Sequence, residues 1–305
     1  MAAQTTLEHP VRQTPGPADG PAATPPKASA WDRIRAGVLS RPALVVAYLW
    51  IALVLVSAFA PQLFTAYDPL TQDTGNRFLQ PSAEHLFGTD QYGRDQFART
   101  VHGTAQSLQA AVVAVLIGLI VGSAIGLIAG ALRGVTDTIV MRVVDIMLAV
   151  PSLIVSLAIV TALGRGTINI AIAIGINSVA TFARLMRSEV LKVRALPYVE
   201  AAAFAGHGFG HRLLRHIVPN ASGSVLAAAT MDIGTAILGV AALSFLGFGA
   251  PPPTPEWGAL VADGRAYLTQ QWWLSTLPGI VIVCSVLAVY RIGRSVNQGR
   301  TNVVG

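Results

Sequence analysis

Charge and cysteine are scarce in this sequence. Only 12% of its 305 residues are Asp, Glu, Lys or Arg and 53% are hydrophobic, whereas a soluble domain carries about 25% charged residues. A soluble globular protein is therefore excluded, and a polytopic membrane protein is indicated. The single cysteine, Cys284, lies inside an apolar run, so the sequence offers neither a disulfide framework nor a thiolate metal site.

Motifs that bind nucleotides or support catalysis are also missing. Without a GxxxxGK[ST] phosphate loop, the chain is not expected to bind or hydrolyse ATP itself. It also lacks HExxH and GxSxG, which argues against a membrane enzyme. His207 and His211 are four residues apart, but the glycines between them disfavour the rigid helical face of a two-histidine metal site. We therefore expect no catalytic residue, cofactor or metal in this chain.

Long apolar runs predict an all-α, polytopic membrane protein with six transmembrane helices. A hydrocarbon core of about 30 Å requires roughly 20 residues at about 1.5 Å per residue. Residues 247–268, rich in proline and glycine, are expected to form a re-entrant segment or a loop. The predicted spans cover residues 43–60, 107–132, 138–163, 168–185, 221–246 and 273–290.

The distribution of Lys and Arg predicts the topology. With the amino terminus inside, the inner segments hold 16 of the 21 Lys and Arg, and the outer segments hold the other 5. The positive-inside rule therefore places both termini in the cytoplasm. The net charge of +6 then reflects membrane topology and gives no reason to expect a nucleic-acid partner. An aromatic belt at the outer interface is expected from Trp257, Tyr267, Trp272 and Trp273.

The segments outside the spans differ in composition. Residues 1–30 are rich in Pro, Ala, Thr and Gly and are expected to form a disordered cytoplasmic tail. Residues 31–42 fit an interfacial helix whose apolar side chains lie on lipid while its arginines face head groups. Residues 43–106 hold the first span and an extracytoplasmic segment, and 294–305 form a second cytoplasmic tail.

Residues 198–220, YVEAAAFAGHGFGHRLLRHIVPN, form the long polar and basic interruption between the later spans. An acid at Glu200 and the alanines behind it favour a short helix. Three glycines within 206–210 then turn the backbone, a basic amphipathic segment follows, and Pro219 can open the next span. Two short helices joined by a glycine elbow suit docking to a soluble partner; an ordinary basic loop is the alternative.

Four glycines and two acids stand out within the predicted spans. Asp145 and Asp232 would each cost about 2.5–3.5 kcal/mol at a span centre, so each should face a partner or a wet cavity. Asp145 is interpreted as a structural partner of Arg142, three residues away on the same face, although both acids remain candidate pathway or proton-relay groups. Successive GxxxG steps on one face of the second span, which favour close helix packing in lipid, comprise Gly118, Gly122, Gly126 and Gly130.

Three stretches resemble a known family. EAAAFAG at 200–206, followed after ten residues by IVPN at 217–220, resembles the EAA loop of ABC importer permeases. FGTDQYGRD at 87–95 and ALSFLGFGAPPPTPEWGALVADGR at 242–265 are similar to the C-type permease subunit of the dipeptide, oligopeptide and nickel importers. The similarity covers roughly residues 31–294 and implies the type I ABC importer permease fold.

The resemblance implies a role and a set of partners. The chain would be a bacterial inner-membrane subunit whose core, at 107–293, forms half of a pathway for dipeptides or oligopeptides. A second homologous permease, two cytoplasmic ATPase subunits or domains that hold ATP and Mg, and an extracytoplasmic substrate-binding lipoprotein would complete the importer. Coupling helices at 198–218 would dock to the ATPase. The motif positions are Glu200, Ala201, Ala202, Gly206, His207 and Pro219 for ATPase coupling, and Gly88, Thr89, Asp90, Gly93, Arg94 and Asp95 for the extracytoplasmic motif.

The sequence also departs from the family pattern. His207 stands where the family often has a small residue, Gly208 and Gly210 loosen the elbow, and Val240 replaces an acid that many relatives carry before ALSFLG. Two alternatives to peptide import stay open. The same architecture could import nickel, haem or another small solute, and a gradient-driven secondary transporter could use the two intramembrane acids as ion sites.

Overall fold

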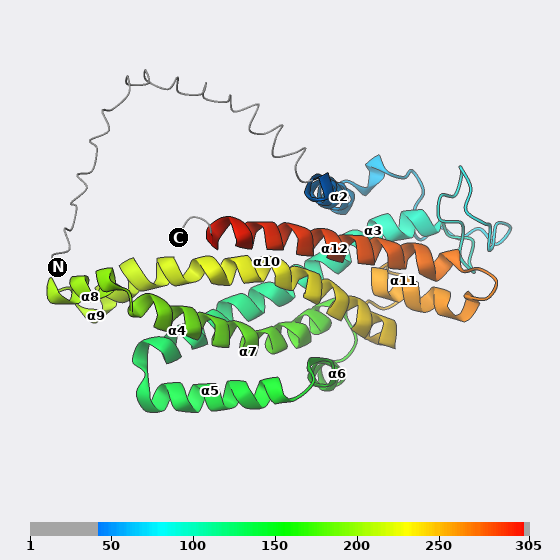
Figure 1. Cartoon of the computed structure of the whole chain (residues 1–305). Coiled ribbons are helices and arrows are strands. Elements are labelled where there is room, and N and C mark those ends of the chain that lie inside the picture. Colours follow the sequence, from blue (N-terminus) through cyan, green and yellow to red (C-terminus); the bar gives the residue numbers. More distant parts are fainter. Residues whose placement is uncertain (1–41, 302–305) are drawn as a thin grey trace, which may run out of the picture. The chain divides into compact units, whose positions relative to one another are not determined.

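The computed structural model describes residues 42–301, with side chains up to residue 295 (Figure 1). Apart from a single bridge between Thr89 and Asp95, all regular structure in this part of the chain is helical. The predicted tail at 1–30 and nearly all of the predicted interfacial helix at 31–42 lie outside the described residues.

The described elements follow one another as helices of very different length. Five of the resulting helical runs are long and apolar enough to cross a membrane, or six if one bent pair counts as a single span. An all-α, polytopic membrane protein is therefore confirmed. The elements are α2 (Pro42–Phe59), η1 (Pro61–Leu63), α3 (Gln96–Ile117), η2 (Gly118–Gly122), α4 (Ser123–Leu132), α5 (Gly134–Ala149), α6 (Ser152–Leu163), α7 (Thr167–Arg194), α8 (Pro197–Phe204), α9 (Phe209–Arg212), η3 (Leu213–Ile217), α10 (Val218–Leu243), η4 (Ser244–Phe248), α11 (Trp257–Gly264), η5 (Arg265–Tyr267) and α12 (Trp273–Thr301).

The predicted third span is not one straight helix. α5 and α6 meet at an angle of 92°, so α5 lies along the bundle while α6 crosses it, seen end-on in Figure 1. Pro151 causes the break. It has no N–H to donate to the helix, and its ring would clash with the carbonyl group of the preceding turn. Val150 accordingly adopts the extended conformation that residues before proline prefer. The predicted span at 138–163 is therefore a bent pair of helices, and it completes the six predicted spans only if the pair is counted as one.

Several predicted spans are longer in the structure than their apolar runs. The second begins at Gln96, where the Asp95 side chain accepts a hydrogen bond from the Ala98 N–H at 2.6 Å and caps α3. The fourth continues to Arg194, and the sixth continues to Thr301. The fifth belongs to a longer helical run from Phe209 to Phe248, which is kinked near its end at Gly247. More polar turns extend these helices beyond their apolar runs, and hydropathy alone does not register them.

α7 lies at the centre of the bundle. It packs against α3, α4, α5, α6 and α10, while α10 packs in turn against α3 and α12. The most deeply buried side chains there include Phe182 and Ile170 of α7 and Ile237 of α10. Many of the contacts between these helices are made by alanine. In lipid the hydrophobic effect does not drive helices together, and small side chains let their backbones approach closely and pack.

The glycine face of the second span lies against α7. A Cβ placed on Gly126 would collide with the Ala183 carbonyl oxygen, and one on Gly122 would lie 2.5 Å from that of Val179. A Cβ on Gly118 or Gly130 would instead meet the side chain of Ser178 or Val190 first, with α7 backbone atoms 3.2 Å away in both cases. The four glycines thus bring two helix backbones into direct contact.

Two of the four predicted belt aromatics are buried instead. Trp257 is 1% exposed, and its Nε1 donates a hydrogen bond to the Thr100 carbonyl oxygen at 3.0 Å, which ties α11 to α3. Trp273 is also buried, whereas Trp272 beside it is 53% exposed. The correction arises because α11 packs between α3 and α12. Of the tryptophans in the predicted belt, only Trp272 stays at the surface of this chain.

Candidate functional site

The helices α8 and α9 form an elbow at one end of the bundle (Figure 1). Proline at Pro197 opens α8 at its first position, where its missing N–H is not needed. Glu200 follows in the first turn, where an acid is favoured by the helix dipole. The elbow that was expected from the glycines of this stretch is present, and residues 205–208 connect the two helices.

The end of α8 is a Schellman motif. The His207 N–H donates to the Ala202 carbonyl oxygen, and the Gly206 N–H donates to the Ala203 carbonyl oxygen, both at 3.1 Å. Gly206 takes the left-handed conformation, with φ of +83°, which the motif requires at this position. The backbone of the elbow is therefore held by defined hydrogen bonds, although the glycines around it suggest looseness.

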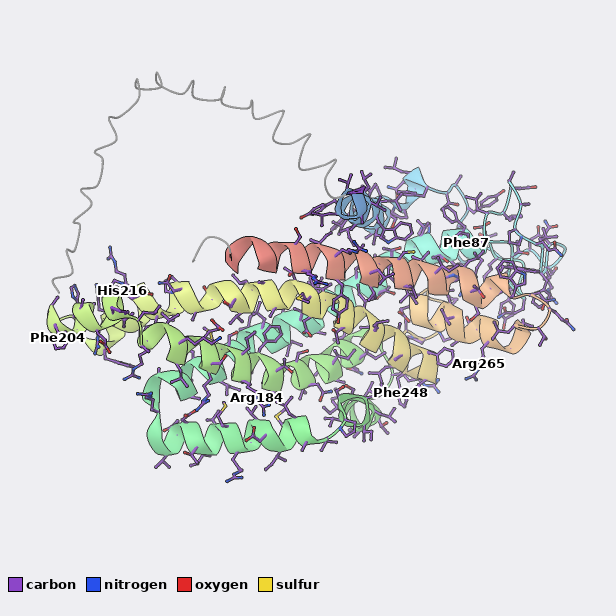
Figure 2. All side chains as sticks on the ribbon, viewed as in Figure 1. Phe87, Arg184, Phe204, His216, Phe248 and Arg265 are labelled. Carbon is purple, nitrogen blue, oxygen red and sulfur yellow. The ribbon has the colours of Figure 1, made fainter. Side chains whose placement is uncertain are left out.

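Large apolar side chains are exposed at this elbow. Phe204, the last residue of α8, is 91% exposed, and Leu214 is 70% exposed. Figure 2 shows Phe204 and His216 at this end of the bundle and Phe87 and Arg265 at the opposite end. Glu200 and Ala201 are exposed as well. An apolar surface rimmed by polar groups at the tip of a bundle is typical of a protein-docking site.

A cavity of about 440 Å³ lies at the base of the elbow, between α7, α8 and α9. Three arginines line it together with Glu200 and several apolar side chains. Arg194 donates a hydrogen bond to the Ala131 carbonyl oxygen at 2.8 Å, so α7 is tied to the end of α4. The elbow thus rests on a basic hollow joined to the central helix. The three arginines are Arg133, Arg194 and Arg212.

The histidines of the elbow lie close together. The rings of His207 and His211 stack with their centroids 4.7 Å apart, and the His216 ring lies 6.0 Å from that of His211. His207 also approaches the Ala202 carbonyl oxygen through Nδ1 at 3.2 Å. In the part of the chain that the structure describes, no three His, Cys, Asp or Glu side chains are arranged to hold a metal ion.

The two acids of the predicted spans have different surroundings. Asp145 pairs with Arg184 of α7 rather than with Arg142, so the expected partner was wrong. Both side chains of this pair are more than half exposed. Asp232 has no cationic partner among the described residues; its Oδ2 accepts a hydrogen bond from the Ser178 hydroxyl at 3.0 Å. It lines a small polar cavity between α6, α7 and α10.

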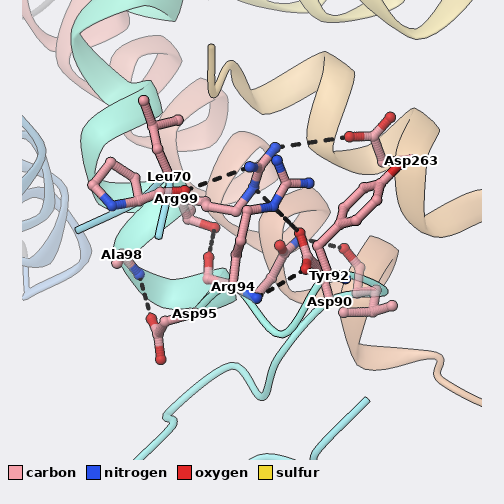
Figure 3. A network of polar contacts seen from close by, with 12 residues as sticks. Leu70, Asp90, Tyr92, Arg94, Asp95, Ala98, Arg99 and Asp263 are labelled. Carbon is pink, nitrogen blue, oxygen red and sulfur yellow. Dashed lines mark hydrogen bonds and ion pairs between the residues drawn. The ribbon is translucent and has the colours of Figure 1, made fainter. Parts of the chain in front are cut away.

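The predicted extracytoplasmic motif folds into a buried ionic network (Figure 3). It precedes α3, at the end of the bundle opposite the elbow in Figure 1. Arg94 donates through Nε to Asp90 at 2.7 Å, and Arg99 lies 3.8 Å from both Asp90 and Asp263. Asp90, Arg94 and Arg99 are each at most 5% exposed. Partial burial raises the pKa of the Asp263 carboxyl, and Arg99 and Arg94 oppose that rise.

The rest of the motif shapes the loop around this network. Gly88 and Gly93 take left-handed conformations, with φ of +70° and +73°. Thr89 accepts a hydrogen bond from the Leu79 N–H at 2.8 Å. Asp95 accepts from the α3 N–H described above and contacts His85 Nδ1 at 2.8 Å. The six motif residues therefore form one structured loop that leads into α3.

Glu256 was not among the residues expected from the sequence, yet it is fully buried. It caps α11 by accepting hydrogen bonds from the Gly258 and Ala259 N–H groups at 3.1 and 3.0 Å. It also accepts one from the Ser107 hydroxyl at 2.9 Å, which joins α11 to α3. The usual cap signal is Ser, Thr, Asp or Asn before a helix, so a glutamate at this position gave no clear signal in the sequence.

Comparison with known proteins gives consistent matches. Residues 122–302 match the family model described as the binding-protein-dependent transport system inner membrane component. The chain is 40% identical over 252 residues to the probable D,D-dipeptide transport system permease protein of Escherichia coli K12, covering 83% of this chain and 84% of that protein. It is 39% identical over 287 residues to the dipeptide transport system permease protein of Alkalihalophilus pseudofirmus, covering 94% and 93%. A glutathione transport system permease protein of Shigella flexneri is 42% identical over 250 residues, covering 82% of each chain.

Two solved structures share the fold at low sequence identity. An amino acid ABC transporter superposes with a TM-score of 0.53 at 17% identity, covering 66% of this chain and 93% of that one. An inward-facing methionine ABC transporter gives a TM-score of 0.51 at 18% identity, covering 65% and 96%. These similarities concern the arrangement of helices.

Proposed function

This chain belongs to the family of binding-protein-dependent transport system inner membrane components, and from this membership we propose that it is the permease subunit of an ATP-driven importer of dipeptides or oligopeptides. The observation that carries the proposal is the identity of about 40% with permeases named for dipeptide, D,D-dipeptide and glutathione transport, over more than four-fifths of the chain. The EAA-type elbow and the folded extracytoplasmic motif agree with it.

The importer needs other subunits. The chain has no phosphate loop, so ATP and Mg belong on two cytoplasmic ATPase subunits or domains. A second homologous permease supplies the other half of the pathway, and an extracytoplasmic lipoprotein delivers the peptide to the end that holds the ionic network of Asp90, Arg94 and Arg99. The same proposal places both termini in the cytoplasm, and the uneven distribution of Lys and Arg between the two sides of the predicted topology supports this orientation.

The elbow of α8 and α9 couples the permease to the ATPase. To move a two-state bundle from 1:99 to 99:1, ATP must favour one state by about 5.5 kcal/mol. Such energy is transmitted only through a rigid connection. The Schellman hydrogen bonds at Gly206 and the bond from Arg194 to the α4 end supply rigidity, and the exposed Phe204 and Glu200 offer contacts to the partner.

Two alternatives remain distinct from this proposal. Nickel, haem or another small solute would use the same architecture, and the names of the three relatives favour peptides over these. A gradient-driven secondary transporter would work without an ATPase. The exposed ion pair of Asp145 with Arg184 does not favour it, because a paired carboxylate is a weaker candidate for an ion site.

Uptake by proteoliposomes tests the proposal. The complete importer, purified with its ATPases, second permease and binding protein, should accumulate radiolabelled dialanine only when ATP is inside and the binding protein outside. Dissipating ion gradients with ionophores should leave uptake unchanged. Uptake by this chain alone, or uptake that collapses with the gradient, would support the secondary transporter, and uptake of Ni²⁺ in place of peptide would reassign the substrate.

A further inference from the structure

A small polar cavity lies near the middle of the central helices. It measures about 190 Å³ and lies between α6, α7 and α10. Besides Asp232, most of its polar lining consists of hydroxyl groups, and no Lys, Arg or His is among its described lining residues. The polar side chains are Ser152, Ser156, Asn177, Ser178, Thr181, Asp232 and Thr235.

The polar groups of this cavity are held in place mainly by hydrogen bonds to one another. Asn177 donates to the Ser152 carbonyl oxygen at 3.0 Å and to the Ser156 hydroxyl, which ties α6 to α7 across the bend. Ser178 occupies Oδ2 of Asp232. Thr235 is bonded to the Tyr290 hydroxyl of α12 at 3.0 Å. Among the described residues, no hydrogen bond is made to Oδ1 of Asp232, so that oxygen is available to a ligand.

The cavity opens on the surface of this chain. Ser152, Thr181 and Thr235 are exposed, while Asp232 behind them is partly buried. A carboxylate at this depth is costly against lipid, and a dense group of hydroxyls beside it would be costly as well. The opening must therefore face water or a partner subunit. In an importer with a shared pathway, water and substrate fill that space.

We propose that this cavity binds the α-ammonium group of a peptide in transit, with Asp232 as the counter-ion. An ammonium group has three donors and no acceptor, and the cavity offers a free carboxylate oxygen and hydroxyl oxygens without a competing cation. The α-ammonium is shared by all unmodified peptides, so one acid serves many sequences. At about 30 Å³ per water, the cavity holds roughly six water volumes, enough for the amino end of a peptide.

This inference rests on the proposed peptide import and is tested in the complete importer. Asp232→Asn keeps the shape of the side chain and removes its charge. Maximal uptake of dialanine, at a saturating concentration of the loaded binding protein, should fall about tenfold, a difference of about 1.4 kcal/mol. Glu189→Gln, which removes an acid of α7 that does not line the cavity, is the control and should stay near the wild-type rate. Uptake of N-acetyldialanine, which lacks the ammonium group, should change little or not at all in Asp232→Asn.

A second readout does not depend on delivery by the binding protein. In a Cys284→Ser background, Thr181→Cys places a thiol at the rim of the cavity. The readout is the ratio of two reaction rates of this thiol: the rate with a cationic methanethiosulfonate (the ethylammonium reagent) divided by the rate with the anionic ethylsulfonate reagent. Asp232 should raise this ratio. Asp232→Asn should lower this ratio about tenfold, because a nearby charge acts on the two reagents with opposite sign.

The outcomes separate the inference from the proposed function. An unchanged reagent ratio together with normal dialanine uptake in Asp232→Asn would overturn the inference. Equal losses for dialanine and N-acetyldialanine would also overturn it, because they would show a role in folding or gating. A wild-type importer that fails to accumulate any peptide would instead overturn the proposed function, and the reagent ratio would still report whether the cavity attracts cations.

Discussion

At the scale of single residues, the described part of the chain concentrates its buried charges at the end of the bundle opposite the elbow. Asp90 and Arg94 are nearly inaccessible and are joined by a direct ion pair, with Arg99 close to the same carboxylate. Ion pairs elsewhere are more exposed, and Lys192, which pairs with Glu189, is 70% exposed. The burial of these pairs decides how much each one contributes to stability.

Removal of Arg94 should destabilise the protein strongly. Arg94→Ala leaves Asp90 buried without its nearest counter-ion, and breaking a buried pair in this way costs about 3–5 kcal/mol. The midpoint of thermal unfolding in detergent, followed by tryptophan fluorescence, should fall clearly. Lys192→Ala is the matched control, because an exposed pair contributes only about 0–1 kcal/mol. Equal midpoints for the two variants would contradict the structural role of the network.

Residue types were predictable from the sequence, whereas their partners were not. Asp145 and Asp232 stood out because acids are rare in spans, and each has a polar partner in the structure. Both partners, Arg184 and Ser178, lie on α7, tens of residues away in the chain. Helical spacing reveals only neighbours within a turn or two, so it suggested Arg142 for the first acid.

At the scale of helices, α4 can pack closely against α7 because glycines of α4, such as Gly126, have no side chain at the contact. Gly126→Ala should weaken it, because the new Cβ meets the Ala183 carbonyl oxygen, and overpacking costs about 1–3 kcal/mol. Gly279→Ala is the control within a span: a Cβ there meets no atom within 4 Å, so the change should be neutral or slightly stabilising. Thermal unfolding of both variants in the same detergent measures the difference. A midpoint for Gly126→Ala at or above that of Gly279→Ala would refute the close packing.

The elbow gives a second comparison between glycines. Gly206 has φ of +83°, where a Cβ costs about 1–2 kcal/mol, while Gly208 has φ of −61°, which any residue adopts. Neither would meet an atom within 4 Å, so conformation alone distinguishes them. Gly206→Ala should therefore slow ATP-driven peptide uptake more than Gly208→Ala does. The test is the initial rate of uptake in proteoliposomes, and a larger loss at Gly208 would contradict the rigid elbow.

The existence of the helices was predictable from the sequence, but their shape was less so. The first span was expected at 43–60 and lies at Pro42–Phe59, because a plain apolar run defines it. The 92° bend at Pro151 was missed, since hydropathy continues on both sides of the proline. The burial of Trp257 also depended on how α11 packs, and amphipathic patterns do not contain that information.

At the scale of the whole molecule, the two ends of the bundle are built for different purposes. One end is a basic, partly apolar elbow with a hydrogen-bonded turn, and the other is a compact loop stabilised by buried ion pairs. α7 runs between them and contacts the cavity of Asp232 on its way. A force applied to α8 and α9 would therefore reach α7, the helix that lines the proposed binding site. The central claim is that this elbow couples peptide import to ATP hydrolysis on another subunit.

One measurement tests that claim most directly. The measurement uses proteoliposomes of the complete importer. Glu200→Ala should lower both peptide uptake and the ATP hydrolysis that peptide-loaded binding protein stimulates, each by about tenfold. The subunits should still copurify. Glu189→Gln, which changes an acid on α7 paired with Lys192, should retain both activities. Wild-type stimulation and uptake in Glu200→Ala would contradict the coupling role of the elbow.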